Sequence, residues 1–219
     1  MTGYPVPRWL RAFADAVPDL DGERFSRFLP PPEGGRRHSA VLVLFGPDPA
    51  GGAAQDEARV VITERAHSMR SHAGQPAFPG GATEPEDRHA ADTALREAWE
   101  EIDLDRASVE VLAELPTLHI PVSGYDVTPV VGWWRSPDPT SLWAMDPREV
   151  ARVVQPTVRE LVDPARRFLV RHPSGFVGPA WEVEGLLVWG FTAGILDRVL
   201  DLAGVSEPWD TSLVRDLPA

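Results

Sequence analysis

Residues 80–104 read GGATEPEDRHAADTALREAWEEIDL, and this stretch decides how the rest of the chain is interpreted. It opens on Gly80-Gly81, two residues that tolerate positive φ and let other groups approach the backbone closely. The run from Ala90 to Ala98 contains good helix formers and neither Gly nor Pro. We therefore expect a glycine loop followed by a helix.

Three carboxylates share one face of this predicted helix. At about 100° per residue, Glu97, Glu100 and Glu101 fall within an arc of roughly 100°. The opposite face is apolar and consists of Ala91, Leu95, Ala98 and Ile102. The acidic cluster is either a solvated helix face or a site for a hard divalent cation such as Mg²⁺, which takes oxygen ligands and bridges to phosphates. The neighbouring Arg96 has the planar guanidinium that can hold a carboxylate in place.

The arrangement of Gly80-Gly81, then R-E-x-x-E-E at residues 96–101, then aliphatic residues at 102 and 104, closely resembles the Nudix box of the Nudix hydrolases. These are metal-dependent enzymes that cleave a nucleoside diphosphate linked to another group. The resemblance implies that Glu97, Glu100 and Glu101 are catalytic and bind Mg²⁺ or Mn²⁺ at the diphosphate. It implies that Arg96 orients a carboxylate.

Two positions depart from the pattern of the family. Asp103 stands where the family usually has Gly, but Asp can enter the left-handed conformation that ends a helix, so we expect the turn to survive. Asp87 is the nearest acid in the first half of the box, and it stands one residue further from Arg96 than the usual spacing. Arg88 takes the strictly aligned place, so the role of Asp87 stays open.

The segment upstream of the box, residues 63–81, is polar and cationic. Taken alone it is typical of a charged surface loop. Joined to the box, it resembles the signature of the coenzyme A pyrophosphatase subfamily. The matching residues are Thr63, Arg65, Met69, Arg70, His72, Gly74, Gln75, Phe78, Pro79, Gly80 and Gly81. Pro76 replaces the usual aliphatic residue and removes one N–H from a possible strand pairing.

The resemblance implies which of these residues meet substrate. Arg65 and Arg70 are the candidates for substrate phosphates, including the 3′-phosphate of coenzyme A. The other candidates for substrate binding in this segment are His72, Gln75, Phe78, Gly80 and Gly81. For His72, a local hydrogen-bonding role is the alternative.

Two later segments carry further candidates. The residues from Ser123 to Pro129 resemble a second segment of the subfamily, in which Tyr125 either stacks on a base or fills the core. Glu149 belongs to an E-V pair that precedes a strand in subfamily members. It is a candidate metal ligand or the general base that deprotonates the attacking water, and the alternative is a solvated Glu at the start of a strand.

The order of the predicted elements defines the fold class. Apolar runs predict strands at 39–45, 58–63, 109–115 and 151–154, residues 157–161 fit a short helix, and residues 166–171 and 181–183 fit a hairpin. Thr192 is a plausible N-cap for a helix over 193–202. We predict an α/β protein, a three-layer α/β/α Nudix sandwich with a mixed sheet and an N-terminal helical extension.

The predicted boundaries are an N-terminal helical extension at residues 1–37, a Nudix domain at 38–204 and a loose tail at 205–219. The resemblance itself covers residues 38–203. In the extension, one helical face carries Trp9, Leu10, Phe13 and Val17, and a second carries Phe25, Phe28 and Leu29.

The composition excludes several other classes of function. The chain of 219 residues contains no cysteine, which rules out disulfides, cysteine-bound zinc and thiol nucleophiles. Its formal net charge of -12 argues against broad binding to nucleic acid or to an anionic membrane. No apolar run has the length of a membrane span and the N-terminus has no secretory signal, so we expect a cytoplasmic protein.

The resemblance implies hydrolysis of coenzyme A or an acyl derivative to 3′,5′-ADP and 4′-phosphopantetheine. Two alternatives stay open. One is a Nudix hydrolase acting on another diphosphate, such as a nucleotide sugar, a dinucleotide or a dNTP. The other is a non-catalytic module that senses a ligand or binds a protein. Members of the family are often dimers, so a homodimer is one implied assembly.

Overall fold

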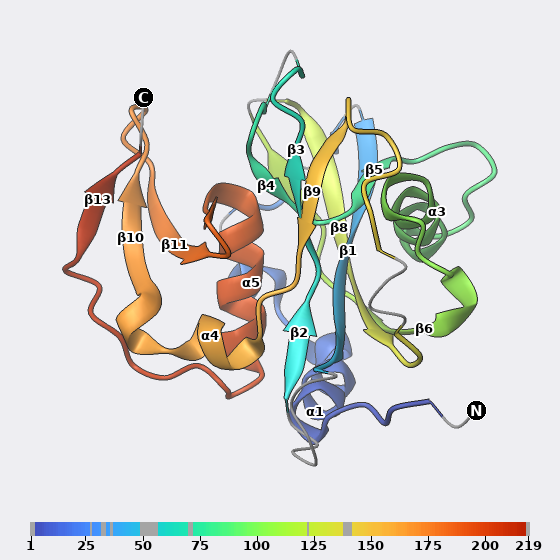
Figure 1. The fold of residues 1–219 in the computed structure, drawn as a ribbon, viewed down its shortest axis with the longest axis horizontal. Coiled ribbons are helices and arrows are strands. Elements are labelled where there is room, and N and C mark those ends of the chain that lie inside the picture. Colours follow the sequence, from blue (N-terminus) through green and yellow to red (C-terminus); the bar gives the residue numbers. More distant parts are fainter. Residues whose placement is uncertain are drawn as a thin grey trace.

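The computed structural model describes residues 3–26, 28–31, 34–35, 37–48, 57–69, 72–121, 123–137 and 142–217. These described residues form three sheets and five α-helices, which are arranged in layers (Figure 1). The helices are α1 (Arg8–Ala16), α2 (Gly22–Phe25), α3 (Ala90–Ile102), α4 (Val158–Val162) and α5 (Gly190–Leu202). Short 3₁₀ turns occupy Val17–Asp19, Arg106–Ser108 and Pro164–Arg166.

The largest sheet has the order β2-β1-β8-β6, with β5 also paired to β1 and β7 also paired to β8. Its strands are β1 (Arg37–Pro47), β2 (Ala58–Val60), β5 (Gly80–Ala82), β6 (Val109–Glu114), β7 (Leu118–Ile120) and β8 (Tyr125–Trp134). Strands β1 and β8 run parallel, with Arg37 opposite Tyr125, and the other pairs are antiparallel. The predicted mixed sheet is therefore confirmed.

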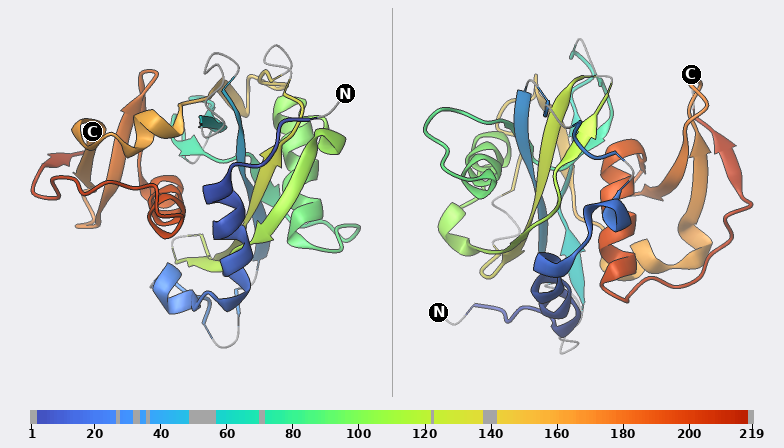
Figure 2. Two further views of the ribbon diagram at one scale, coloured as in Figure 1. Left: turned by 90° about the horizontal axis from the view of Figure 1, so that it is seen from below. Right: turned by 180° about the vertical axis from the view of Figure 1, so that it is seen from behind.

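Helices cover both faces of this sheet, which confirms the predicted α/β/α layering (Figures 1 and 2). On one face, α3 buries Ala94, Ala98 and Ile102 against alternate residues of β1 and β8. On the other face, α1 and α5 pack in the larger core cluster, which includes Phe45 and Trp133. The period of two in the strands thus sends successive residues of β1 into two separate cores.

A second sheet of three strands, in the order β4-β3-β9, continues from the first. It contains β3 (Ile62–Arg65), β4 (Pro76–Ala77) and β9 (Val150–Val154). The single strand predicted at 58–63 is divided at Val61, where β2 ends before β3 begins. Pro76 lies on the edge strand β4, where a missing N–H is tolerated.

Thr192 does not cap α5, and this prediction is wrong. The helix begins two residues earlier at Gly190, after Trp189 in extended conformation. The hydroxyl of Thr192 instead donates to the carbonyl of Pro76 at 2.9 Å, which ties the first turn of α5 to β4.

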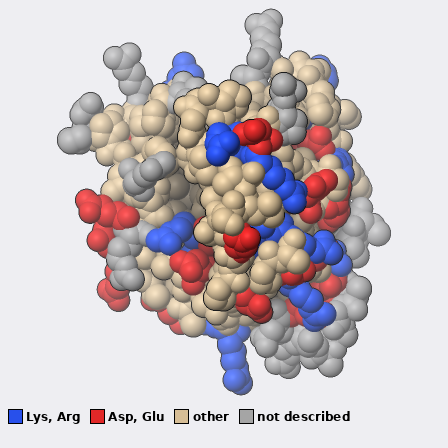
Figure 3. All heavy atoms as spheres, turned by 90° about the vertical axis from the view of Figure 1, so that its left-hand side faces the viewer, with Lys and Arg blue, Asp and Glu red and all other residues tan. Residues whose placement is uncertain are grey.

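A third sheet lies beyond α5, with the order β12-β11-β10-β13 (Figure 1). Its strands are β10 (Arg167–Arg171), β11 (Val177–Val183), β12 (Leu186–Val188) and β13 (Val214–Asp216). The predicted hairpin is confirmed, since β10 and β11 pair antiparallel. On this side of the molecule, basic and acidic side chains are interspersed (Figure 3).

The chain after residue 204 is docked rather than loose, contrary to the prediction. Strand β13 pairs parallel to β10, with Leu169 opposite Val214. The buried Arg167 binds Asp197 and Ser206 and lies 4.6 Å from the ring centroid of Trp209. A buried cation with these partners holds the C-terminal segment against α5.

The predicted helices of the N-terminal segment are confirmed in part. Helix α1 buries Leu10 and Phe13, as expected from their spacing. The second helix spans only Gly22–Phe25, so Phe28 and Leu29 lie outside it. Within the described part of the chain, no helix combines the length and apolar character needed to cross a bilayer.

Candidate active site

Gly80 and Gly81 lie directly against the acidic face of α3. The backbone N–H of Gly80 donates to Oε2 of Glu101 at 3.1 Å. A Cβ added to Gly81 would lie 2.5 Å from the carboxylate atoms of Glu97. Gly81 therefore allows the Glu97 carboxylate to approach strand β5 more closely than any other residue would permit, and the contact of Glu101 is made by the backbone of Gly80.

Arg96 connects the carboxylates of the helix. Its Nη1 lies 3.0 Å from Oε1 of Glu97 and 3.2 Å from Oε2 of Glu100, one helical turn further on. Its Nη2 also donates to the carbonyl oxygen of Ala82 at 2.8 Å. The guanidinium is thus fixed between α3 and the end of β5.

Asp87 is the carboxylate that Arg96 holds, which answers the question its spacing left open. Arg96 donates to its Oδ2 from Nη2 at 3.0 Å and to its Oδ1 from Nε at 3.3 Å. The nearly buried Asp87 also accepts from the hydroxyl of Thr93 at 2.9 Å and the N–H of Glu84 at 3.0 Å. Hydrogen bonds from Arg96 above all lower its pKa from 3.8 to about 2. Asp87 is therefore ionised and anchors the guanidinium.

Sequence reasoning missed Thr93 as part of this arrangement. Its side chain is fully buried in the first turns of a helix whose neighbouring core residues are alanines. At about 100° per residue Thr93 falls on the acidic side of the predicted helix, opposite Ala91, Leu95, Ala98 and Ile102, so the helical pattern gave no signal of its burial.

Burial disfavours the charged forms of two of the three predicted metal ligands. It raises the pKa of Glu101 to about 7, opposed by the Gly80 N–H and Arg65 and reinforced by the charges of Glu97 and Glu149. Burial also raises the pKa of Glu97, although Arg96 opposes the shift. Perturbed carboxylates of this kind are common at functional sites.

Arg65 and Glu149 lie outside the Nudix box in the sequence, and both are close enough to Glu101 to affect its charge. Arg65 ends β3 opposite Val150 of β9, and the carbonyl of Glu149 accepts from the N–H of Ala66 at 2.9 Å. Both charges act on the Glu101 carboxylate. The Nε of Arg65 is buried and has no hydrogen-bond partner among the described residues, which is an unusual state for a charged donor at this position.

The remaining predicted residues lie in three other settings. His72 and Gln75 bond to each other, Nδ1 to Oε1 at 2.7 Å, in the turn after β3, which favours the local role for His72. Phe78 is 3% exposed and packs in the core, which favours packing over contact with substrate. Tyr125 lies at the start of β8 beneath the guanidinium of Arg37, 5.5 Å from the ring centroid. Arg70 lies outside the described residues.

The donor set suits a divalent cation, although the side chains do not form a finished coordination sphere. Within the described ranges, no group of three or more acidic or histidine side chains converges as a metal site. Glu97 and Glu100 instead contact Arg96, and Glu101 contacts Gly80. All three offer the carboxylate oxygens that Mg²⁺ and Mn²⁺ prefer, and their mutual repulsion would be relieved by a cation.

A glycine loop followed by a helix with three clustered carboxylates, between the layers of an α/β/α sandwich, defines the class of hydrolases that act on diphosphates with a divalent metal. The family model described as the NUDIX domain matches residues 36–174, and the chain belongs to the Nudix family. It is an enzyme of the pyrophosphohydrolase class, and Nudix hydrolases generally use divalent metal ions.

Two bacterial proteins similar to this chain have the same name. The chain is 36% identical over 190 residues to a protein of Photorhabdus laumondii named uncharacterized Nudix hydrolase NudL, which covers 80% of this chain and 92% of that protein. It is 35% identical over 173 residues to NudL of Escherichia coli K12, covering 77% and 84%. The crystal structure of the Nudix hydrolase RenU of M. smegmatis has a TM-score of 0.50 at 18% identity, covers 80% of this chain and 94% of that one, and shares the fold.

Proposed function

We propose that the chain hydrolyses the diphosphate bond of coenzyme A or acyl-coenzyme A, giving 3′,5′-ADP and 4′-phosphopantetheine or its acyl derivative. The observation that carries the proposal is the place of Arg65. This residue of the upstream signature lies where its charge acts on Glu101 of the box, and it has an unpartnered donor there. The signature and the box thus contribute to one site.

In this proposal Glu97, Glu100 and Glu101 hold Mg²⁺ or Mn²⁺. The metal, when bound, supplies positive charge to the diphosphate and lowers the pKa of bound water. Arg65 binds a diphosphate oxygen through its guanidinium group, and Arg70 is the second candidate for a substrate phosphate. Arg96, anchored on Asp87, keeps Glu97 and Glu100 in position.

Hydrolysis requires that a water proton be removed as its oxygen bonds to phosphorus and the bridging P–O bond breaks. The proton passes to a carboxylate, and Glu149 and Glu101 are the two candidates for this base. Glu149 is exposed at the start of β9, whereas Glu101 lies beneath Gly80.

Three further parts of the proposal concern the whole protein. We expect residues 38–204 to form the catalytic unit, with the extension at 1–37 and the segment at 205–219 packed on it. We also expect a homodimer that acts in the cytoplasm on a small-molecule substrate, without nucleic acid or membrane.

The test is turnover of coenzyme A, acetyl-coenzyme A, ADP-ribose, NADH and dNTPs with Mg²⁺ or Mn²⁺, with the products identified by mass. We expect 3′,5′-ADP from coenzyme A and its loss in Glu101→Gln. Preferred cleavage of ADP-ribose, NADH or a dNTP would support hydrolysis of a diphosphate but would reject coenzyme A as the substrate. Metal binding without any turnover would favour a ligand-sensing module instead.

A further inference from the structure

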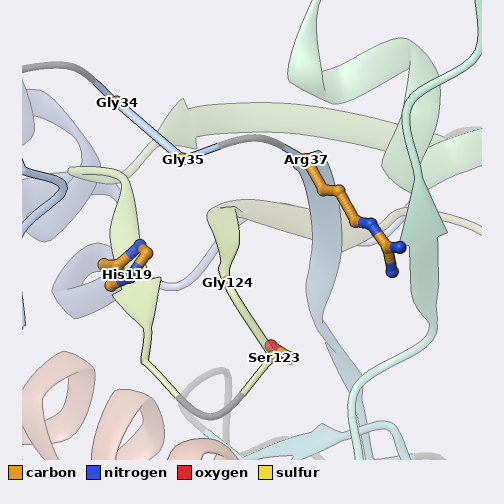
Figure 4. Close-up of a pocket in the computed structure, with 6 residues that line it drawn as sticks. All are labelled: Gly34, Gly35, Arg37, His119, Ser123 and Gly124. Atoms are coloured by element: carbon orange, nitrogen blue, oxygen red, sulfur yellow. The ribbon is translucent and has the colours of Figure 1, made fainter.

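A hollow of about 380 Å³ opens where β1 and β8 begin (Figure 4). It is lined by Gly34, Gly35, Arg37, His119, Ser123 and Gly124. The close-up shows Arg37 and His119 on opposite sides, with the two glycines of one segment above and Ser123 and Gly124 below. Three side chains with hydrogen-bond donors therefore surround a space bordered largely by glycine backbone.

The buried Asp126 fixes His119. Its Oδ1 lies 2.7 Å from Nδ1 of His119, and its Oδ2 accepts from the N–H of Gly35 at 2.5 Å. Burial raises the pKa of Asp126, but the hydrogen bonds from His119 and Gly35 and the nearby histidines outweigh it and the pKa is lowered. An ionised carboxylate only accepts, so Nδ1 carries a proton. Among the described residues Nε2 has no hydrogen-bond partner, and it is the ring nitrogen left for a ligand.

Arg37 supplies the positive charge. Among the described residues it makes no hydrogen bond or ion pair, and its guanidinium contacts the Tyr125 ring. All of its N–H groups are therefore available.

The glycines keep the hollow open and hold Asp126 in place. Apart from its chain neighbours, a Cβ on Gly124 would meet no atom of the described residues within 4 Å. A Cβ on Gly35 would lie 2.5 Å from the Asp126 carboxylate and would break the contact that positions it.

The hollow lies within reach of the candidate active site. On β1, Arg37 pairs with Tyr125 of β8, and three residues later Ala40 pairs with Gly81 of β5. At the rise of a β-strand, these two points are about 10 Å apart. Arg37 and Ala40 point to opposite faces of the sheet. Because Arg37 is the first residue of β1, a nucleotide-sized ligand would meet both places by passing around the end of this strand.

We propose that this hollow binds a phosphate monoester carried by the nucleoside end of the substrate. Arg37 contacts the phosphate, while Nε2 of His119 and the hydroxyl of Ser123 contact the polar atoms of the sugar and base. This inference rests on the proposed function. In coenzyme A this phosphate monoester is the 3′-phosphate. Arg65 then binds the diphosphate rather than the 3′-phosphate.

The experiment compares coenzyme A with 3′-dephospho-coenzyme A, which differs only in this phosphate. For Arg37→Ala we expect KM for coenzyme A to rise about tenfold, the usual effect of losing a hydrogen bond to a charged group, with little change for the dephospho compound. His119→Ala should raise KM for coenzyme A with kcat retained. Arg171→Ala, which removes the same charge on the third sheet, is the matched control. Equal changes for both substrates in Arg37→Ala, or no change, would overturn the proposal.

A binding measurement separates this inference from the proposed function. Isothermal titration of the metal-free full chain should show adenosine 3′,5′-bisphosphate binding about tenfold tighter than 5′-AMP, and Arg37→Ala should abolish the difference. Equal binding of the two nucleotides by the wild type would refute the hollow as a phosphate site even if coenzyme A is cleaved. If the bisphosphate binds without competing with coenzyme A, the hollow binds a separate effector. The proposal that it binds the 3′-phosphate of the substrate would then be rejected.

Discussion

Arg96 and Asp87 form a two-point contact, with Nη2 3.0 Å from Oδ2 and Nε 3.3 Å from Oδ1, across the loop that leads into α3. The same guanidinium bonds Glu97 and Glu100 through Nη1. Two carboxylates that are candidate metal ligands thus depend for their orientation on a third carboxylate outside the helix.

The first prediction is that Asp87→Asn lowers kcat about 10- to 100-fold, the usual range for the partner of a metal-site residue. The amide retains the volume of the side chain but loses the charge that anchors Arg96. Metal affinity, measured by titration with Mn²⁺, should fall with kcat. Asp92→Asn is the control, because Asp92 on the same helix pairs with the exposed Arg88 and not with Arg96. A loss of the same size in both variants would contradict the role given to Asp87.

The second prediction concerns acid stability. The folded-state pKa of Asp87 is about 2, below its ordinary 3.8, so its contribution to stability is complete above pH 4 and disappears as the pH falls toward 2. Urea denaturation of the wild type should therefore show a falling free energy of unfolding across this range. The slope should be smaller in Asp87→Asn. Parallel curves for the two proteins would be inconsistent with an ionised, paired Asp87.

The helix and its acidic face were predictable because both depend on local sequence. Ala90 to Ile102 lacks breakers, and a helix places Glu97, Glu100 and Glu101 together whatever surrounds it. The pairing of Arg96 with Asp87 was not predictable in the same way. The loop between β5 and α3 absorbs the extra residue, and a spacing rule contains no information about loop conformation.

The arrangement of the sheets depends on contacts distant in sequence, which periodicity does not reveal. The break at Val61 separates two strands that look like one run, because β3 pairs with β9 almost 90 residues away. Phe78 was assigned to substrate because the signature contains it, yet it packs in the core. A motif therefore marks residues needed for the shape of a site as well as those that meet the ligand.

The third prediction concerns the end of α3. Asp103 has φ 57° and ψ 32°, and its N–H bonds the carbonyl of Trp99 at 3.0 Å, so the expected left-handed turn is confirmed. Because Gly adopts this conformation without strain, Asp103→Gly should raise the free energy of unfolding by about 1 kcal/mol. Activity should not change. Asp103→Val, with a branched Cβ, should be destabilised, and urea denaturation at neutral pH would measure both effects.

The fourth prediction concerns the approach of Glu97 to strand β5. A Cβ at Gly81 would lie 2.5 Å from the Glu97 carboxylate, so Gly81→Ala must displace that side chain. A displacement of this kind costs about 100-fold in kcat when catalysis depends on the position of the carboxylate. The hydrogen bond from Gly80 to Glu101 is made by the backbone, so the fold should persist and far-UV circular dichroism should be unchanged.

Gly194→Ala is the control for Gly81→Ala, because the same substitution at this position should stabilise the protein. A Cβ there meets no atom within 4 Å, and the residue lies inside α5, where Ala is favoured over Gly by about 1 kcal/mol. We expect this variant to gain stability and retain kcat. If Gly81→Ala retained kcat as well, Glu97 would not need its place against β5, and the metal would have to be held by Glu100 and Glu101 with a carboxylate from outside the helix.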